Sequence, residues 1–209
     1  MGSDSFLEAV ESATETALGR LASSKSLIAL TDASLDRGSV MVVAAGRERA
    51  AAEAYGGWSE SADDPAGSTF ADVAARHRSN LESILDLHDE SEAPAASTDP
   101  MHASLANAES DLERAAMLVG RSLVEERVAK QFVGFFINEA DQVAADRFRA
   151  VRESMNTSRD DGLELLSTLC ESDDDWNRAV DMTTATIQAA YDQYVDTLEG
   201  MGVNPKPVC

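Results

Sequence analysis

The sequence predicts an all-α protein, a bundle of antiparallel helices that share one core. Apolar residues recur at alternating steps of three and four along most of the 209-residue chain, which is the spacing of one helix face. No segment alternates apolar and polar residues with the period of two that a half-buried strand requires. Hydrophobic residues make up 44% of the chain, enough for one sizeable core, so we expect a single domain over residues 1–209.

The first predicted elements are an accessory helix and a hairpin of two core helices. An amphipathic stripe that follows Ser5 predicts the accessory helix, over about residues 5–21. Two longer stripes predict core helices over about residues 35–60 and 68–88, separated by a short connection of small and polar residues. Such short connections join antiparallel neighbours, so these two helices should pair.

An acidic segment rich in Ala, Ser and Pro then predicts a solvated crossover. Asp99 and Pro100 make a helix-start pattern, which predicts a second accessory helix over about residues 100–119. Gly120 is expected to end it.

The second pair of core helices is predicted from the remaining stripes. Ser122 and Glu125 form a capping-box pattern that opens the longest predicted helix, over about residues 123–155. An acidic turn precedes the last, over about residues 174–200. The simplest arrangement is a four-helix bundle of two hairpins joined by a long crossover that contains its own helix.

The net charge of −21, from 38 acidic and 17 basic residues, is the most unusual feature of the composition. Such a surface repels nucleic acid and anionic membranes, which bind mainly through Lys and Arg. Acidity with so little Lys indicates adaptation to a salt-rich cytosol, where ions screen the self-repulsion. The alternative is a moderately acidic protein without that adaptation.

Cysteine content and hydropathy bear on the compartment. Two cysteines, Cys170 and Cys209, cannot make a disulfide framework, which favours a reduced environment. The sequence starts without a signal-like segment, and no apolar run approaches the roughly 18 residues of a membrane span. We therefore expect a cytoplasmic protein.

Polar residues interrupt the inner stripes of the predicted core helices at mid-length. His77 and Asn80 complete the stripe of the second helix, Glu48 lies in the first, and Asp141 lies in the third. Burial of such groups costs a few kcal/mol unless a partner satisfies them, so they should meet in one layer. Further candidates for this inner polar layer lie on the last helix: Gln188, Tyr191 and Tyr194.

These motifs resemble those of rubrerythrins, which belong to the ferritin-like superfamily. Glu48-x-x-Ala51-x-x-x-Tyr55 is similar to the first metal-binding helix of that family, and His77-x-x-Asn80 stands where the family has Glu-x-x-His. Asp141-x-x-Ala144-x-x-x-Phe148 resembles the first element again. The chain is thus identified as a rubrerythrin-like protein of haloarchaeal type, and the resemblance implies a ferritin-like four-helix bundle plus accessory helices. By resemblance, Glu48, His77 and Asp141 would be metal ligands.

The di-iron site that the resemblance implies is degenerate in this sequence. Position by position, His77 replaces a bridging Glu and Asn80 replaces a ligating His. In the last helix, the corresponding pair is Gln188 with Tyr191 or Tyr191 with Tyr194, and neither restores Glu-x-x-His. The family's Cys-x-x-Cys domain is also missing from the sequence.

Three interpretations of this polar cluster remain open. The first is a buried hydrogen-bond network, with His77 paired to Glu48 or Asp141 and Asn80 bonded to a tyrosine. The second is a mononuclear iron, manganese or zinc site made by Glu48, His77 and Asp141. The third is a working di-iron centre with ligands from outside the family positions.

The function predicted on this basis is a non-catalytic scaffold or partner-binding protein, with no resident cofactor and no catalytic residue assigned. Its partner would be a second copy, giving a homodimer, or another protein. The alternative is an iron-dependent oxidoreductase that reduces peroxide or oxidises iron at a remodelled site, with Tyr191 as a nearby donor. The sequence leaves open whether the protein is an enzyme.

Overall fold

A computed structural model describes residues 2–87 and 94–206, and within these residues all regular structure is helical. The all-α prediction is therefore confirmed for the described part of the chain. The elements are α1 (Ser3–Leu21), α2 (Lys25–Leu30), α3 (Arg37–Ser61), α4 (Ala66–Leu85), α5 (Pro100–Ser104), a 3-10 turn (Leu105–Asn107), α6 (Asp111–Asn138), α7 (Gln142–Leu169) and α8 (Asp173–Gly200).

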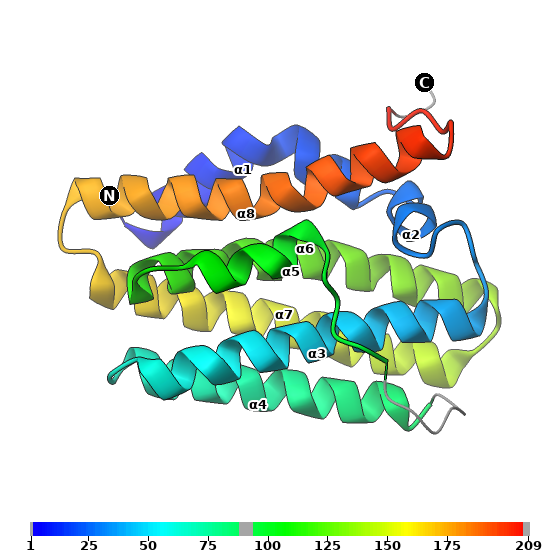
Figure 1. Ribbon diagram of the computed structural model, residues 1–209, viewed down its shortest axis with the longest axis horizontal. Helices are drawn as coiled ribbons and strands as arrows, with labels where there is room; N and C mark the ends of the chain where they lie inside the picture. Colours follow the sequence, from blue (N-terminus) through cyan, green and yellow to red (C-terminus); the bar gives the residue numbers. More distant parts are fainter. Residues whose placement is uncertain (1, 88–93, 207–209) are drawn as a thin grey trace.

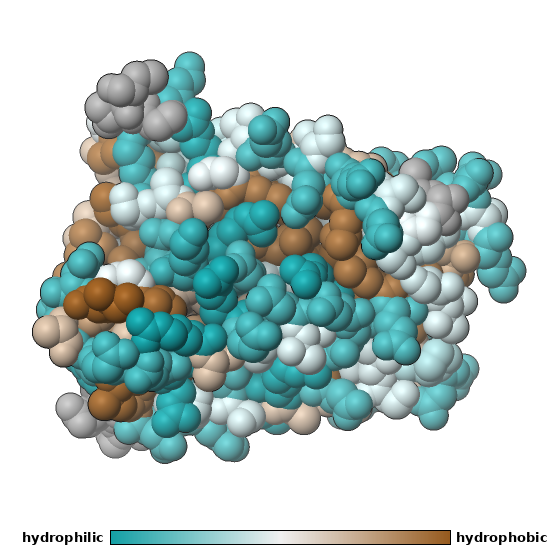
Figure 2. All heavy atoms as spheres, turned by 180° about the vertical axis from the view of Figure 1, so that it is seen from behind, coloured by the Kyte–Doolittle hydropathy of each residue, from teal (hydrophilic) through white to brown (hydrophobic). Residues whose placement is uncertain are grey.

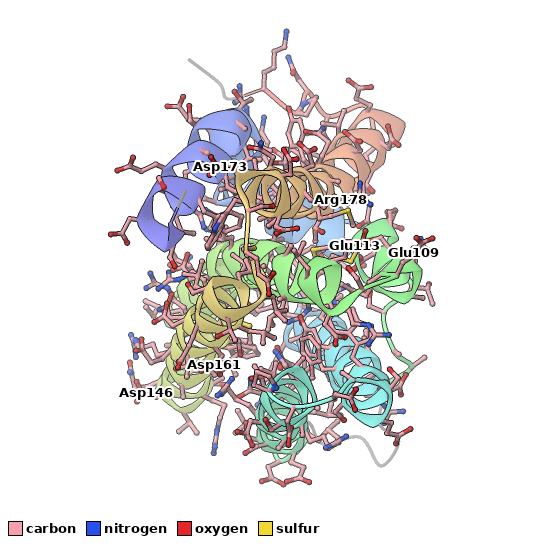
Figure 3. All side chains as sticks on the ribbon, turned by 90° about the vertical axis from the view of Figure 1, so that its left-hand side faces the viewer. Glu109, Glu113, Asp146, Asp161, Asp173 and Arg178 are labelled. Atoms are coloured by element: carbon pink, nitrogen blue, oxygen red, sulfur yellow. The ribbon has the colours of Figure 1, made fainter. Side chains whose placement is uncertain are left out.

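The long helices form three stacked layers of two helices each (Figure 1). Helices α3 and α4 make one outer layer, α6 and α7 the middle layer, and α1 and α8 the other outer layer. The same order appears when the molecule is seen from its end in Figure 3. The α3–α4 and α6–α7 pairs are antiparallel hairpins, and the crossover between them contains the short α5 (Figure 1). The first hairpin agrees with the prediction, whereas the second was expected between helices at 123–155 and 174–200.

The first half of the chain follows the sequence prediction closely. The accessory helix expected at 5–21 is α1, and the core helices expected at 35–60 and 68–88 are α3 and α4. Residue 88, the predicted end of the second core helix, lies outside the described residues, as does Cys209. The crossover runs against α3 at Gly46, whose carbonyl accepts a hydrogen bond from Ser97 N (2.8 Å). A Cβ there would lie 2.9 Å from Ala95 O, so only glycine permits this approach.

The helix predicted at 123–155 is wrong, because the chain turns back in the middle of that range. Helix α6 ends at Asn138, and α7 begins at Gln142 after a short turn. Ala140 adopts a left-handed conformation (φ 58°), and the Asp141 side chain accepts a hydrogen bond from Ala144 N (3.0 Å). Asp141 therefore caps the start of α7.

The boundary predicted at Gly120 is also wrong, since this glycine lies inside α6. The accessory helix expected over 100–119 is instead the short α5, the 3-10 turn and the first turns of α6. A Cβ on Gly120 would lie 2.9 Å from Thr183 O on α8. The glycine therefore permits close packing of two helices and does not end one.

Helix α8 agrees with the range predicted for it but occupies a different place. The acidic turn expected before it forms a capping box, between Ser172 and Asp175. It packs on α6, α1, α5 and α2, so α7, and not α8, completes the four-helix arrangement with α3, α4 and α6. Near its start Arg178 pairs with Glu113 of α6 (2.6 Å, Figure 3).

The molecular surface is mostly hydrophilic on the face seen in Figure 2, with apolar residues at the left-hand end of the view and in a band across its upper middle. Large apolar side chains that are exposed near the α6–α7 turn and the start of α3 are Leu35, Ile137 and Val143. Within the described residues, none of the helices combines the length and the apolar character needed to cross a bilayer.

Candidate functional site: a buried arginine-centred network

Polar side chains from helices α3, α4, α6 and α7 and from the start of α5 meet in one interior layer, which we call the arginine-centred network. Helical spacing places them there: His77 and Asn80 are three residues apart, and Arg121 and Glu125 are four apart, so each pair shares a helix face. The members are Arg47, Glu48, His77, Asn80, Asp99, His102, Arg121, Glu125 and Ser154.

Arg121, at the centre of the network, is completely buried. Its Nε donates to His102 Nε2 (3.1 Å), its Nη2 donates to Arg47 O (3.2 Å), and its Nη1 lies 3.4 Å from His77 Nε2. The guanidinium carbon is also 6.0 Å from the ring centre of Tyr55, within cation–π range. One side chain thus joins α6 to α3, α4 and α5.

The two histidines on either side of Arg121 make the same pattern of contacts. His77 Nδ1 lies 2.7 Å from Glu48 Oε2, and His102 Nδ1 lies 2.7 Å from Asp99 Oδ2. An arginine can only donate, so Nε2 of each ring accepts and the proton sits on Nδ1, facing the carboxylate. Both rings are therefore neutral, in keeping with burial, which lowers the pKa of both histidines.

Arg47 holds two of the three carboxylates of the network, Glu125 and Asp99. Its Nε donates to Glu125 Oε1 (3.0 Å), and its Nη1 donates to Asp99 Oδ2 (2.7 Å). Burial is the largest single effect on Glu125 and opposes its ionisation, but the charges of Arg47 and Arg121 and the hydrogen bonds from Arg47 together outweigh it and lower the pKa of Glu125 to about 2. The carboxylate is thus ionised at neutral pH.

Glu48 is satisfied by α4 and not by an arginine. Its Oε2 accepts from His77 and from Asn80 Nδ2 (3.0 Å), and Asn80 also donates to Ser154 Oγ on α7 (2.8 Å). Burial opposes ionisation here too, yet the contacts with His77 and the charge of Arg121 lower the pKa of Glu48. The Asn80 amide was expected to bond a tyrosine, and its contacts with Glu48 and Ser154 correct that expectation.

The donor set does not match the demands of a di-iron centre. Iron in such sites takes its charge balance from carboxylates with free lone pairs, whereas Asp99 and Glu125 are already paired with Arg47. The void beside Glu48, Arg47 and Glu125 measures about 10 Å³, space for about one water molecule. In residues 2–87 and 94–206, no three His, Cys, Asp or Glu side chains group as metal ligands would.

The structure brings together Glu48, His77 and Asn80, three of the residues that the sequence singled out. It does not bring Asp141 to them. Asp141 lies at the α6–α7 turn, where it caps α7 and contacts Arg37 Nε (3.3 Å). The expectation that Asp141 faces the core is wrong, because the turn places it at the end of the bundle.

The three candidates on the last helix also lie outside the network. Gln188 is exposed and donates to Asp192 (2.6 Å). Tyr191 stacks on Tyr194 with ring centres 6.0 Å apart, and the Tyr194 hydroxyl donates to Pro205 O (3.2 Å). These residues lie outside the network because α7, and not α8, packs beside both α4 and α6 in the bundle.

Sequence reasoning missed Arg47, Arg121, Glu125 and the Asp99–His102 pair. From the sequence, Glu125 was assigned only to a capping box and Asp99 only to a helix cap. Asp99 does cap α5. One signal was available for Arg121 and Glu125: with Val128 and Phe132, they continue a single stripe along a segment that is otherwise strongly apolar. The polar neighbours of His102 favour a solvated side chain, yet His102 is buried.

No protein family, curated protein or solved structure matches this chain.

Proposed function

We propose that this chain is a rubrerythrin-related helical bundle in which a structural ionic network replaces the metal layer. It acts as a non-catalytic scaffold or partner-binding protein in a salt-rich cytosol. The supporting observation is that each ionisable group of the layer is already committed to another protein group. A catalytic acid, base or metal ligand needs a free lone pair or proton facing substrate.

The two buried guanidinium groups add an electrostatic argument. Arg47 and Arg121 carry fixed positive charges inside the layer, and burial removes the water that would screen them. A divalent cation placed among them would be repelled, and it would also have to displace the ion pairs of Arg47 with Glu125 and Asp99. The network is thus better suited to holding helices in register than to binding iron.

Elemental analysis of protein purified without a histidine tag tests this proposal. After equilibration with Fe²⁺, Mn²⁺ or Zn²⁺ and removal of unbound metal, we expect far less than one metal ion per chain. Glu48→Gln removes the only carboxylate of the layer that no arginine holds, and Glu53→Gln is its control, because Glu53 lies exposed on the same helix.

The competing function, an iron-dependent oxidoreductase that reduces peroxide or oxidises iron, has its own signature in this experiment. Stoichiometric iron that Glu48→Gln abolishes and Glu53→Gln retains would refute the scaffold proposal. Light scattering on the same samples reports whether the chain is a monomer or a homodimer.

A further inference from the structure

A narrow pocket lies beside the network, between α1, α2, α3, α6 and α8. Helix α2 contributes Ser26, Ala29 and Leu30, which share one face of that short helix. Val124 and Val128 of α6 form the opposite wall. The pocket measures about 20 Å³ and adjoins a wider depression of about 200 Å³.

The narrow pocket contains an unsatisfied polar group. Ser26 is 1% exposed, and its Oγ has no hydrogen-bond partner in the described part of the chain. A buried hydroxyl without a partner is destabilising, so a group that bonds it would bind favourably. This orphaned hydroxyl therefore points to a ligand.

The wider depression supplies apolar side chains, within a lining that also includes polar residues such as Ser97 and Asp99. It shares Leu30, Arg47 and Gln193 with the narrow pocket, so the two hollows meet around these side chains. Val42, 39% exposed, and Val43 line its wall. An apolar chain lying there would cover Val42, while a polar end group reaches into the narrow part.

The charges around the two hollows disfavour an ionic ligand. Arg47 is the cation on their shared wall, and it already faces two carboxylates, Glu125 and Asp99. An added carboxylate or phosphate would meet this excess of negative charge, and an ammonium group would lose its hydration without a free carboxylate to pair with, because Arg47 already holds both. An uncharged hydrogen-bonding group avoids both penalties.

We infer that these adjoining hollows form a binding site for a small uncharged molecule with an apolar chain and one hydroxyl, carbonyl or amide group that hydrogen-bonds Ser26. This site is separate from the buried layer that carries the scaffold proposal, and it stands whether or not that layer binds metal. Arg47 lines both hollows and belongs to the network, so it is the residue that connects the binding site to the network.

Methyl NMR on the whole chain tests the site, with 1-butanol as the probe and butanoate as its charged counterpart. We expect 1-butanol to shift the methyl signals of Leu30, Val42 and Val124 saturably, and butanoate at neutral pH to bind at least about tenfold more weakly. Ser26→Ala should weaken 1-butanol binding about tenfold, the effect of losing one hydrogen bond.

Ser122→Ala is the matched control. The Ser122 hydroxyl is also buried and unpartnered in the described part of the chain, but it does not line either hollow. Both variants remove an unsatisfied hydroxyl, so neither should unfold the protein. The inference is overturned if 1-butanol gives no saturable shift, if butanoate binds as well, or if both variants bind 1-butanol equally.

Discussion

Arg121 is the residue on which the interior of the bundle depends most directly. Its guanidinium has no access to water, and its hydrogen bonds include two to histidine nitrogens and one to a backbone carbonyl. A buried charge without its partners, or partners without their charge, is far costlier than the intact pair. The network is therefore held as a unit, and removal of its centre should affect every helix that it joins.

Arg121→Leu should lower the free energy of unfolding by about 3–5 kcal/mol, because it leaves His77 Nε2, His102 Nε2 and the Arg47 carbonyl unpaired. Urea denaturation followed by circular dichroism measures the change. Arg147→Leu removes the same charge from an exposed position on α7 and should stay within about 0.5 kcal/mol of wild type. Equal losses in the two variants would contradict a structural role for Arg121.

The two neutral histidines make stability depend on pH in a defined direction. Burial lowers the pKa of His77 and of His102 below 6.5, so below about pH 6.5 the unfolded chain binds protons that the folded chain does not. Above pH 6.5 these groups should not affect the free energy of unfolding. As the pH is lowered from 6.5, the free energy of unfolding should decrease by up to about 1.4 kcal/mol per pH unit for each histidine.

Urea titrations between pH 8 and pH 5 check this dependence. The carboxylates add their own loss only at lower pH, near and below 4.5, where the unfolded chain begins to protonate groups such as Glu48 and Glu125 whose pKa is lowered in the folded state. The double variant His77→Gln/His102→Gln should show a shallower slope between pH 6.5 and pH 5. An unchanged slope would mean that other groups titrate there.

At the level of elements, two glycines of α6 allow the effect of helix packing to be measured separately from the effect of helix propensity. Gly120→Ala places a methyl group 2.9 Å from Thr183 O, so α8 must move, and we expect a loss of about 1–3 kcal/mol. Gly134→Ala on the same helix meets nothing within 4 Å and should gain about 0.5–1 kcal/mol from reduced backbone entropy in the unfolded chain. Urea unfolding measures both, and a gain at position 120 would show that α6 and α8 are not tightly packed.

The turn between α6 and α7 shows where the sequence pattern stops being informative. Glu139, Ala140 and Asp141 contain no glycine or proline, although Ala140 takes a left-handed conformation that residues with a Cβ seldom adopt. The apolar stripe continues across the turn, because both helices bury residues on the same core. Periodicity alone therefore reads the two helix segments as one.

Helical spacing also explains why only part of the network was predictable from the sequence. Glu48, His77 and Asn80 interrupt stripes whose other members are apolar, so their inward position follows from spacing. Arg121 lies where α6 is buried nearly all round, so the stripe that it shares with Glu125 and Val128 is not set apart by exposed neighbours on the other faces. Which carboxylate pairs with which cation depends on the relative heights of separate helices, and local spacing carries no information on that.

For the molecule as a whole, the opposing terms are a buried network and a surface of high negative charge. The net charge of −21 on this compact chain makes the folded state repel itself. Added salt shortens the screening length from about 10 Å at 0.1 M to about 3 Å at 1 M, which weakens that repulsion between exposed groups. Salt does not reach ion pairs inside the bundle, such as Arg47 with Glu125, and so screens them much less.

Stability should therefore rise with salt, while the energetic effect of the network should not change. In dilute buffer we expect a weakened helical signal and loss of a cooperative unfolding transition, with recovery of both in about 1 M KCl. Salt titration with circular dichroism measures this. The difference between wild type and Arg121→Leu, compared at salt concentrations where both unfold cooperatively, should stay constant, because the hydrogen bonds that this substitution removes lie in the buried interior. Equal wild-type stability at low and high salt would exclude salt adaptation and leave the acidic surface without that explanation.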